Sequence, residues 1–158
     1  HAIDRASVDH LALVSSAISA VAVEARLRGV RVEFAAPDSD RGIFLDGARC
    51  RDALTGLLQS LLALAPRGGT LLSVGAQITS IRPALIVECR LHESDPELSP
   101  EALQRFFDAG WREHPCGTHG APLLAALALT ARAHGGRVDV KMMGKGCLVT
   151  FVVPRLEG

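Results

Sequence analysis

Apolar residues recur three and four positions apart in three segments of the chain, which predicts three amphipathic helices. The first helix is expected over residues 8–25 and ends before Gly29. The second follows Asp46, which is a favourable N-cap, and ends at a proline followed closely by two glycines. The third is expected over about residues 122–134, before a glycine pair.

Alternating apolar and polar positions predict strands between these helices. The segment VRVEF, residues 30–34, alternates and is β-branched, and the short run IFLD follows a turn cluster at residues 36–42. Residues 70–78 and 84–91 also alternate, and the short connection between them favours an antiparallel hairpin. The segment 137–154 predicts a second hairpin, with its turn at MGKG.

Between the two hairpins, the pattern predicts one short helix and one loop. Ser99 and Pro100 form a good N-cap and first-turn pair, and we expect the short helix to carry Phe106 and Phe107. Residues 112–120 are polar and contain several helix breakers, which is typical of a mobile surface loop.

Length and charge exclude several classes of partner. The chain has 158 residues, which suits one compact domain. Its 17 basic and 17 acidic side chains balance, so we expect no nucleic acid and no membrane contact. The sequence lacks a long uncharged apolar stretch and a signal-peptide pattern, which predicts a cytoplasmic location. Four scattered cysteines without a CxxC pair argue against disulfides and a metal site.

Interleaved helices and antiparallel strands are typical of a two-layer sandwich. We expect an α/β (α+β) fold in which three helices cover one face of a mixed, mostly antiparallel sheet. The domain is predicted to span residues 7–155, after a linker at residues 1–6 and before a tail at residues 156–158.

In this order and at this spacing, several segments resemble the ATP-binding catalytic domain of two-component sensor histidine kinases, which has the GHKL or Bergerat fold. Residues 43–74 look like the family's N-box helix with its proline and double-glycine exit. The segment LSPEALQRFFDAGW, residues 98–111, is similar to the passage from the first glycine box into the F box. Residues 131–140 and 144–154 look like the family's helix exit and closing hairpin. The resemblance covers about residues 7–155 and implies this fold.

The resemblance also implies where a nucleotide would bind, and the matching residues depart from the family pattern. In the N box, an asparagine completes the magnesium shell, whereas this chain has Ser60, a weaker oxygen donor for a hard cation. In the first glycine box, an aspartate accepts from the adenine amino group, and Glu93 stands at that position. Asp95 and Glu97 replace two glycines that let the backbone approach the base, and their charges would repel a triphosphate.

The second glycine box also departs from the family. There the glycines begin a helix whose free amide hydrogens face the phosphates. Here Pro122 removes one amide donor, and Leu123 places a bulky side chain where a phosphate would lie. Gly117 and Gly120 are the glycines that remain beside this box. We expect the helix to persist, the phosphate cradle to be lost and Leu123 to fill the volume of the phosphates.

These departures favour a signal-transduction module that binds partners, a pseudokinase-type catalytic domain with a degenerate ATP site and no cofactor. Its expected partners are the phosphoacceptor helical hairpin of the same protein and the receiver domain of a response regulator. The alternative is a divergent but active histidine kinase domain. It would hold Mg-ATP through Glu93, Ser60 and the backbone of residues 112–120, and would phosphorylate a histidine outside this chain. A binding switch like the anti-sigma factors is a third alternative with the same fold.

Two groups of histidines have simpler interpretations. His114, Cys116 and His119 are metal-ligand types in one segment, but without a fourth ligand the pattern favours a solvated loop. His134 ends a predicted helix, and we interpret it as a structural residue rather than a phosphoacceptor.

Overall fold

The computed structural model describes residues 3–37 and 42–154. The predicted tail at residues 156–158 lies outside the described residues, as do residues 1–2 of the predicted linker and residues 38–41 of the predicted turn. Along the chain, the elements are β1 (Ala6–Val8), α1 (His10–Ala20), α2 (Ala22–Leu27), β2 (Val30–Ala35), β3 (Ile43–Leu45), α3 (Gly47–Ala63), β4 (Thr70–Ile78), β5 (Ala84–Leu91), α4 (Pro100–Gln104), α5 (Gly117–Ala133), β6 (Arg137–Met143) and β7 (Gly146–Pro154).

Within the described residues, five strands form one sheet in the order β2-β4-β5-β7-β6, and β1 pairs with β3 separately. The strands β2 and β4 are parallel because the crossover helix α3 lies between them in sequence. The other neighbouring pairs of the five are antiparallel. The mixed, mostly antiparallel sheet and both predicted hairpins are therefore confirmed.

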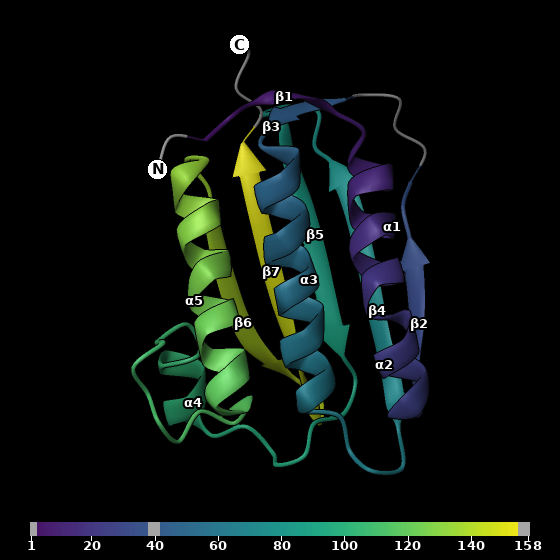
Figure 1. The fold of residues 1–158 in the computed structure, drawn as a ribbon, viewed down its shortest axis with the longest axis vertical. Helices are drawn as coiled ribbons and strands as arrows, with labels where there is room; N and C mark the ends of the chain where they lie inside the picture. Colours follow the sequence, from purple (N-terminus) through teal and green to yellow (C-terminus); the bar gives the residue numbers. More distant parts are fainter. Residues whose placement is uncertain (1–2, 38–41, 155–158) are drawn as a thin grey trace.

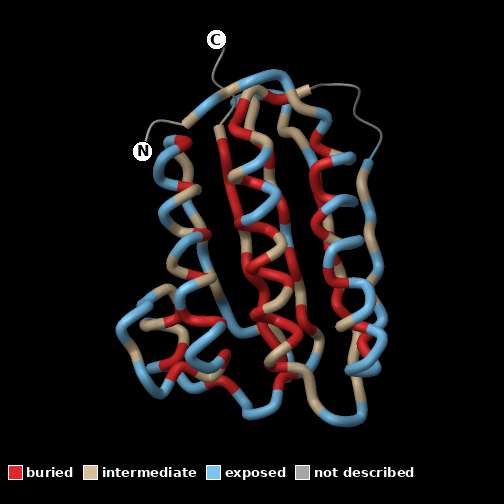
Figure 2. The backbone as a smooth tube through the Cα atoms, viewed as in Figure 1, coloured by how far each residue is buried: buried red, intermediate tan, exposed pale blue. Residues whose placement is uncertain are grey.

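The long helices cover one face of this sheet, which confirms the two-layer sandwich (Figure 1). Helix α3 lies in the middle, with α1 and α2 on one side and α5 on the other. Figure 2 shows that buried positions gather on the sides of the helices that face the central strands. The stripe predicted for the middle helix is part of this core, because Cys50, Leu54, Leu57 and Leu61 are buried. None of the helices in the described part of the chain has the length and apolar character needed to cross a bilayer.

The helix predicted over residues 8–25 is divided in the structure. Val8 belongs to β1 and pairs with Ile43 of β3, so the chain forms a short strand where the helical stripe was expected to begin. At Val21 the backbone N–H bonds to the Ile18 carbonyl at 3.1 Å, three residues back, and the helix breaks into α1 and α2. The apolar spacing survives this break because Val21 and Ala25 remain buried.

Two predicted boundaries near the third helix were wrong. Helix α4 ends at Gln104, so Phe106 lies in the turn that follows it. Helix α5 begins at Gly117, which shortens the loop predicted over residues 112–120. Glycines in this segment suggested a loop, but Gly120 lies where α5 meets α3. A Cβ on Gly120 would lie 2.5 Å from the Cys116 Cβ, which requires glycine, and 3.5 Å from the Ser60 hydroxyl oxygen.

The two outer strands of the sheet carry exposed ion pairs. On β2, Arg31 and Glu33 lie 3.3 Å apart, and on β6, Arg137 and Asp139 lie 3.1 Å apart. Each pair joins residues two positions apart, which share one face of a strand.

Candidate functional site

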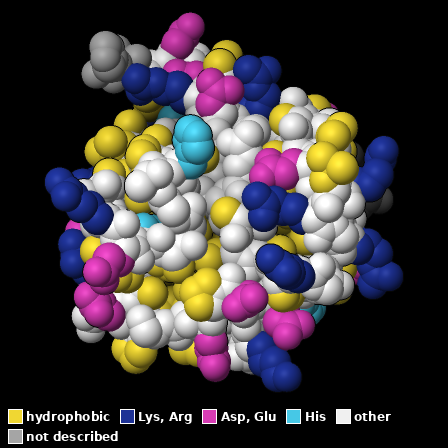
Figure 3. All heavy atoms as spheres, turned by 60° about the horizontal axis from the view of Figure 1, so that its bottom comes forward, with side chains coloured by type: hydrophobic (Ala, Val, Ile, Leu, Met, Phe, Trp, Pro, Cys, Tyr) yellow, Lys and Arg dark blue, Asp and Glu magenta, His cyan; other side chains and the backbone are white. Residues whose placement is uncertain are grey.

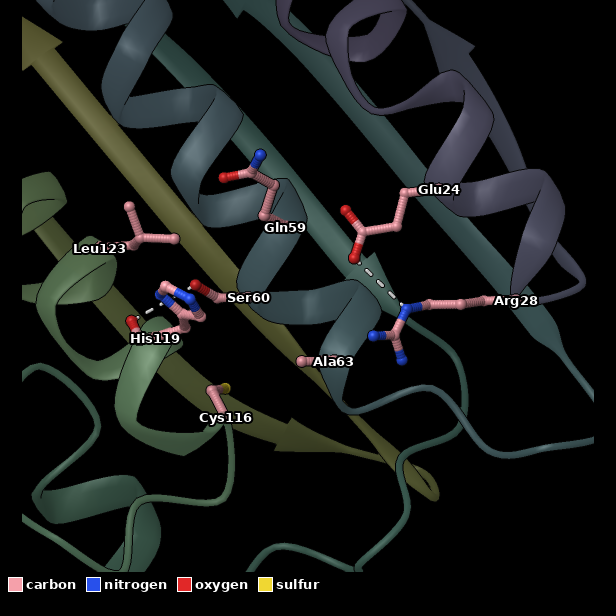
Figure 4. A pocket seen from close by; sticks show the side chains of 9 residues that line it. Glu24, Arg28, Gln59, Ser60, Ala63, Cys116, His119 and Leu123 are labelled. Atoms are coloured by element: carbon pink, nitrogen blue, oxygen red, sulfur yellow. Dashed lines mark hydrogen bonds and ion pairs between the residues drawn. The ribbon is translucent and has the colours of Figure 1, made fainter.

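A cavity of about 330 Å³ lies among α2, α3 and the first turns of α5 (Figure 4). Its volume is at the lower end of the range for small-molecule pockets. Three positions predicted from the nucleotide boxes line it together, namely Ser60, Gly120 and Leu123. The complete lining is Glu24, Arg28, Gln59, Ser60, Ala63, Cys116, His119, Gly120 and Leu123.

Ser60 is buried at the contact between α3 and α5. Its hydroxyl donates to the Gly56 carbonyl of its own helix at 2.8 Å, and it lies 3.4 Å from the Gly120 carbonyl of α5. A serine hydroxyl has one proton, so these two carbonyls share a single donor. The hydroxyl is therefore engaged with helix backbone at the position where the family pattern has a magnesium-binding amide.

Leu123 packs against α3 at Gly56. A Cβ placed on Gly56 would lie 3.2 Å from both Cβ and Cδ2 of Leu123, which is tighter than ordinary van der Waals contact. Gly56 is buried, and it leaves room for the leucine side chain between the two helices. The structure therefore places Leu123 at the wall of the cavity, in contact with the helix that was predicted to carry the N box.

An ion pair lies on the α2 side of the cavity. Arg28 Nε and Glu24 Oε1 are 3.3 Å apart, one helical turn from each other, and both side chains are partly exposed. Figure 4 shows this pair pointing toward each other across from Ser60 and His119. The guanidinium of Arg28 therefore already has an anionic partner beside the cavity.

The two predicted adenine-box residues, Glu93 and Asp95, lie elsewhere. They line a second pocket of about 420 Å³, which shares no lining residue with the first and consists of Pro66, Glu93, Ser94, Asp95, Glu97 and Lys145. The Ser94 N–H donates to the Lys145 carbonyl at 3.0 Å, and the Asp95 N–H donates to the Leu64 carbonyl at 2.7 Å. These bonds hold the segment against the end of α3 and the β6–β7 turn.

The residues before α5 form a turn that is held by hydrogen bonds of His114, where the sequence predicted a solvated loop. His114 is buried, its Nε2 donates to the Phe106 carbonyl at 2.7 Å, and its Nδ1 accepts from the Cys116 N–H at 3.0 Å. This arrangement assigns a neutral ring with its proton on Nε2. Gly117 then takes a φ of +79°, which favours glycine, and His119 is exposed. Among the described residues, no group of side chains is arranged to hold a metal ion.

Aromatic side chains anchor this turn. The Phe106 ring is fully buried, and its centroid lies 5.4 Å from that of His114. Trp111 contacts the same histidine ring, with centroids 5.6 Å apart, and Arg105 lies over the indole at 5.1 Å. Phe106, which lies in the segment that resembles the F box, is therefore buried against the histidine of this turn.

No protein-family model and no curated protein matches the chain. Solved structures do match it. The histidine kinase AdeS of Acinetobacter baumannii aligns with a TM-score of 0.77 at 14% identity, over 99% of this chain and 70% of the other. The catalytic domain of histidine kinase ThkA gives 0.80 at 14% identity, over 97% and 99%. Full-length ShkA in complex with AMPPNP gives 0.76 at 20% identity, over 100% and 32%. The chain has the fold of a histidine kinase catalytic domain.

The expected fold is thus confirmed. Whether the cavity suits Mg-ATP depends on the charge of its lining. The cavity lining carries one carboxylate, Glu24, and one guanidinium, Arg28, so its formal charge is zero with His119 neutral. Ser60 is bonded to helix backbone, and Leu123 is packed on Gly56. A polyanion is stabilised by an excess of cationic and amide donors. The described lining has no such excess of positive charge.

Several lining residues were not predicted from the sequence. Glu24 and Arg28 are spaced four apart at the end of a helix, a pattern that indicates an ion pair but not a pocket. Gln59 is different, because it and Ser60 are polar residues within the apolar run LLQSLL. Two adjacent polar residues on a buried helix are a signal that would have pointed to this part of α3.

Proposed function

We propose that this chain is the catalytic-type domain of a two-component sensor histidine kinase, that its nucleotide site has degenerated, and that it acts in the cytoplasm by binding other domains. The fold supports the first part, because structures of histidine kinases match the chain over nearly its full length. The neutral lining of the cavity supports the second part.

The observation that carries the proposal is the contact between Leu123 and Gly56. In a nucleotide-binding domain of this fold, α3 and α5 would hold the phosphates between them. Here the Leu123 side chain of α5 packs on Gly56 of α3 so closely that a Cβ on Gly56 would lie 3.2 Å from it. A triphosphate that lay between α3 and α5 at this point would have to displace the side chain and meet apolar surface. Both changes weaken binding.

The proposed partners are the phosphoacceptor helical hairpin of the same protein and the receiver domain of a response regulator. The histidine kinase ThkA has also been crystallised in complex with the response regulator TrrA, and that structure matches this chain with a TM-score of 0.75. A domain with this fold and without phosphotransfer would influence signalling by occupying such a surface or by competing for it.

Isothermal titration with Mg-ATP and Mg-ADP tests the loss of nucleotide binding. We expect no saturation up to about 1 mM nucleotide, which corresponds to a binding free energy weaker than about −4 kcal/mol. ShkA is the positive control, because its structure contains AMPPNP. Saturation of this chain at tens of micromolar would contradict the proposal.

The second candidate is an active Mg-ATP-dependent histidine kinase domain, and the cavity itself favours it. The space among α2, α3 and α5 is open, and the Gln59 side chain, whose amide oxygen is a possible magnesium ligand, lies beside it. This candidate predicts phosphorylation of a helical hairpin by this domain with radiolabelled ATP. If the hairpin is not labelled and no nucleotide binds, the kinase candidate is rejected and the binding module is supported.

A further inference from the structure

A third pocket, an open groove, lies at the end of α2. Arg28 separates it from the cavity among α2, α3 and α5. Its volume is about 460 Å³, and it runs between the exit of α2 and the turn that follows α3. We call it the α2 groove. It is lined by Arg26, Leu27, Arg28, Gly29, Ala65, Pro66, Arg67 and Gly68.

The α2 groove is strongly basic. Three of its eight lining residues are arginines, and none is acidic. Within the described residues, Arg28 is paired with Glu24, whereas no salt bridge is found for Arg26 or Arg67. Both of these arginines are exposed. Figure 3 brings the lower end of Figure 1 forward, and several Lys and Arg side chains lie on its right-hand side, where α2 lies, with acidic side chains among them.

Large apolar side chains are exposed beside these charges. Leu27 is 82% exposed and Val23 is 66% exposed, and the two are one helical turn apart on α2. Among the described residues, few large apolar side chains are as exposed as these two. An apolar ridge next to unpaired guanidinium groups is the composition of a protein-binding surface.

The floor of the α2 groove is held rigid by a backbone contact. Gly29 and Gly69 have φ values of +69° and +79°, and a Cβ on Gly69 would overlap the Gly29 carbonyl. The exit of α2 and the turn after α3 therefore touch through main chain. A groove whose two walls are fixed in this way loses little conformational freedom when a ligand binds.

We propose that the α2 groove binds an acidic segment of a partner protein. An apolar side chain of that segment packs against Leu27 and Val23, and its carboxylates bind Arg26 and Arg67. The occupant is argued from charge complementarity, because guanidinium groups bind carboxylates through paired donors. Arg28 lines both this groove and the cavity, but Arg26, Leu27 and Arg67 line the groove alone, so the inference holds whether or not Mg-ATP binds.

The neighbouring pocket limits how the segment lies. Pro66 lines both pockets, and beyond it the charged lining consists of three carboxylates and one lysine, namely Glu93, Asp95, Glu97 and Lys145. Carboxylates of a partner that extended past Pro66 would meet a net negative lining, because Lys145 offsets only one of the three carboxylates. The acidic segment is therefore confined to the side of α2, and a basic extension is favoured beyond Pro66.

Fluorescence anisotropy with a defined probe tests the proposal. The probe is a fluorescein-labelled helical peptide with two leucines one turn apart and glutamates on either side of them. We expect saturable binding to the wild-type chain that weakens as salt is raised. Arg26→Glu with Arg67→Glu should lower the affinity at least about tenfold, because two attractive contacts are lost and two repulsive ones replace them. Leu27→Ser should lower it as well.

The matched control is Arg82→Glu, which reverses an exposed arginine in the turn between β4 and β5, and it should leave the affinity unchanged. A probe with lysines in place of glutamates should bind the doubly reversed variant better than the wild type. Far-UV circular dichroism checks that each variant is folded. The proposal is overturned if the acidic probe does not saturate by about 1 mM, which is the weakest affinity worth assigning to a specific contact. Equal affinities for Arg82→Glu and the double variant, or an unchanged affinity for Leu27→Ser, would also overturn it.

Discussion

The backbone N–H of Asp46 donates to Nε2 of His134 at 3.0 Å, which joins the start of α3 to the end of α5. The opposite ring nitrogen, Nδ1, bonds to the Thr130 carbonyl at 2.8 Å. Because Nε2 accepts, the imidazole is neutral and donates through Nδ1. His134 is fully buried, so its role is to connect two helices whose sequence positions are far apart. This agrees with the structural interpretation of His134 from the sequence.

Replacing His134 with alanine should destabilise the domain. The substitution leaves the buried N–H of Asp46 without a partner, which costs about 2 kcal/mol in the free energy of unfolding. The Thr130 carbonyl loses the ring N–H but keeps the backbone N–H of residue 134, at 3.2 Å. Urea denaturation measures this loss. His119→Ala is the matched control, because His119 is an exposed histidine on the same helix and should change stability by less than about 0.5 kcal/mol. Equal effects of the two substitutions would contradict the role assigned to His134.

Asp46 should make stability depend on pH. Its carboxylate accepts from the Asp4 N–H at 3.0 Å and from the Arg49 N–H at 3.2 Å. The bond from Asp4 is the main reason that the pKa of Asp46 is lowered, while burial acts in the opposite direction. A pKa lower in the folded than in the unfolded state stabilises the fold above about pH 4, and this contribution is lost as pH falls through the folded value.

The measurement is urea denaturation of the wild type and of Asp46→Asn from neutral to acidic pH. Asparagine keeps a capping oxygen but does not titrate in this range. The wild-type free energy of unfolding should therefore fall more steeply than that of Asp46→Asn below about pH 4. Parallel curves would show that Asp46 is not responsible.

The contact between Gly56 and Leu123 should appear as an energetic coupling. In the wild type, Gly56→Ala brings a methyl group to 3.2 Å from Leu123, and strain opposes the gain in helix propensity. In a Leu123→Ala background, that strain is removed, and the same change should stabilise the domain by up to about 1 kcal/mol. A double-mutant cycle in urea measures the coupling, which we expect to be about 1 kcal/mol. Additive effects would mean that α3 and α5 adjust freely at this point.

The close approach of Gly29 and Gly69 should tolerate no side chain. Gly69→Ala forces a Cβ into the Gly29 carbonyl at a positive φ, so we expect a loss of more than about 1 kcal/mol in the free energy of unfolding. Gly68→Ala is the adjacent control, because a Cβ there would meet nothing within 4 Å. Thermal denaturation of the two variants compares them directly. A stable Gly69→Ala variant would contradict the rigid floor of the α2 groove.

The four cysteines should be unreactive in the folded domain. Cys50, Cys89, Cys116 and Cys147 are buried, and burial raises the pKa of each thiol to about 12. Reaction with a disulfide reagent requires the thiolate, so labelling at pH 8 should wait for unfolding. Timed labelling with and without urea checks this. Fast labelling of Cys116 without denaturant would show that the cavity it lines opens readily.

Hydrophobic spacing predicted most of the helices and strands, because burial on one face leaves a period in the sequence. It did not predict β1, since three residues are too few to show alternation and their partner strand begins at Ile43. The break at Val21 was also missed, because the buried side of α1 and α2 continues through it. The start of α5 was misplaced because Gly117 and Gly120 look like loop residues, although Gly120 provides the space that the Cys116 side chain occupies at the start of the helix.

The candidate site was predictable in part. Ser60, Gly120 and Leu123 were expected together from the family resemblance, and they line one cavity. Glu93 and Asp95 were associated with the same nucleotide, yet they line another pocket. Their position depends on backbone bonds to α3 and to the β6–β7 turn, which side-chain identity alone does not reveal.

The ion pairs on β2 and β6 have a consequence beyond the single domain. Within the described residues, β2 and β6 each pair with a neighbour on one side only, so each is an edge strand of the five-stranded sheet. A second copy that extended the sheet at either border would have to accommodate Arg31 with Glu33, or Arg137 with Asp139, against its own strand. Charged borders of this kind discourage uncontrolled polymerisation of sheets. They leave contacts through helices and grooves as the favoured mode of assembly for this domain.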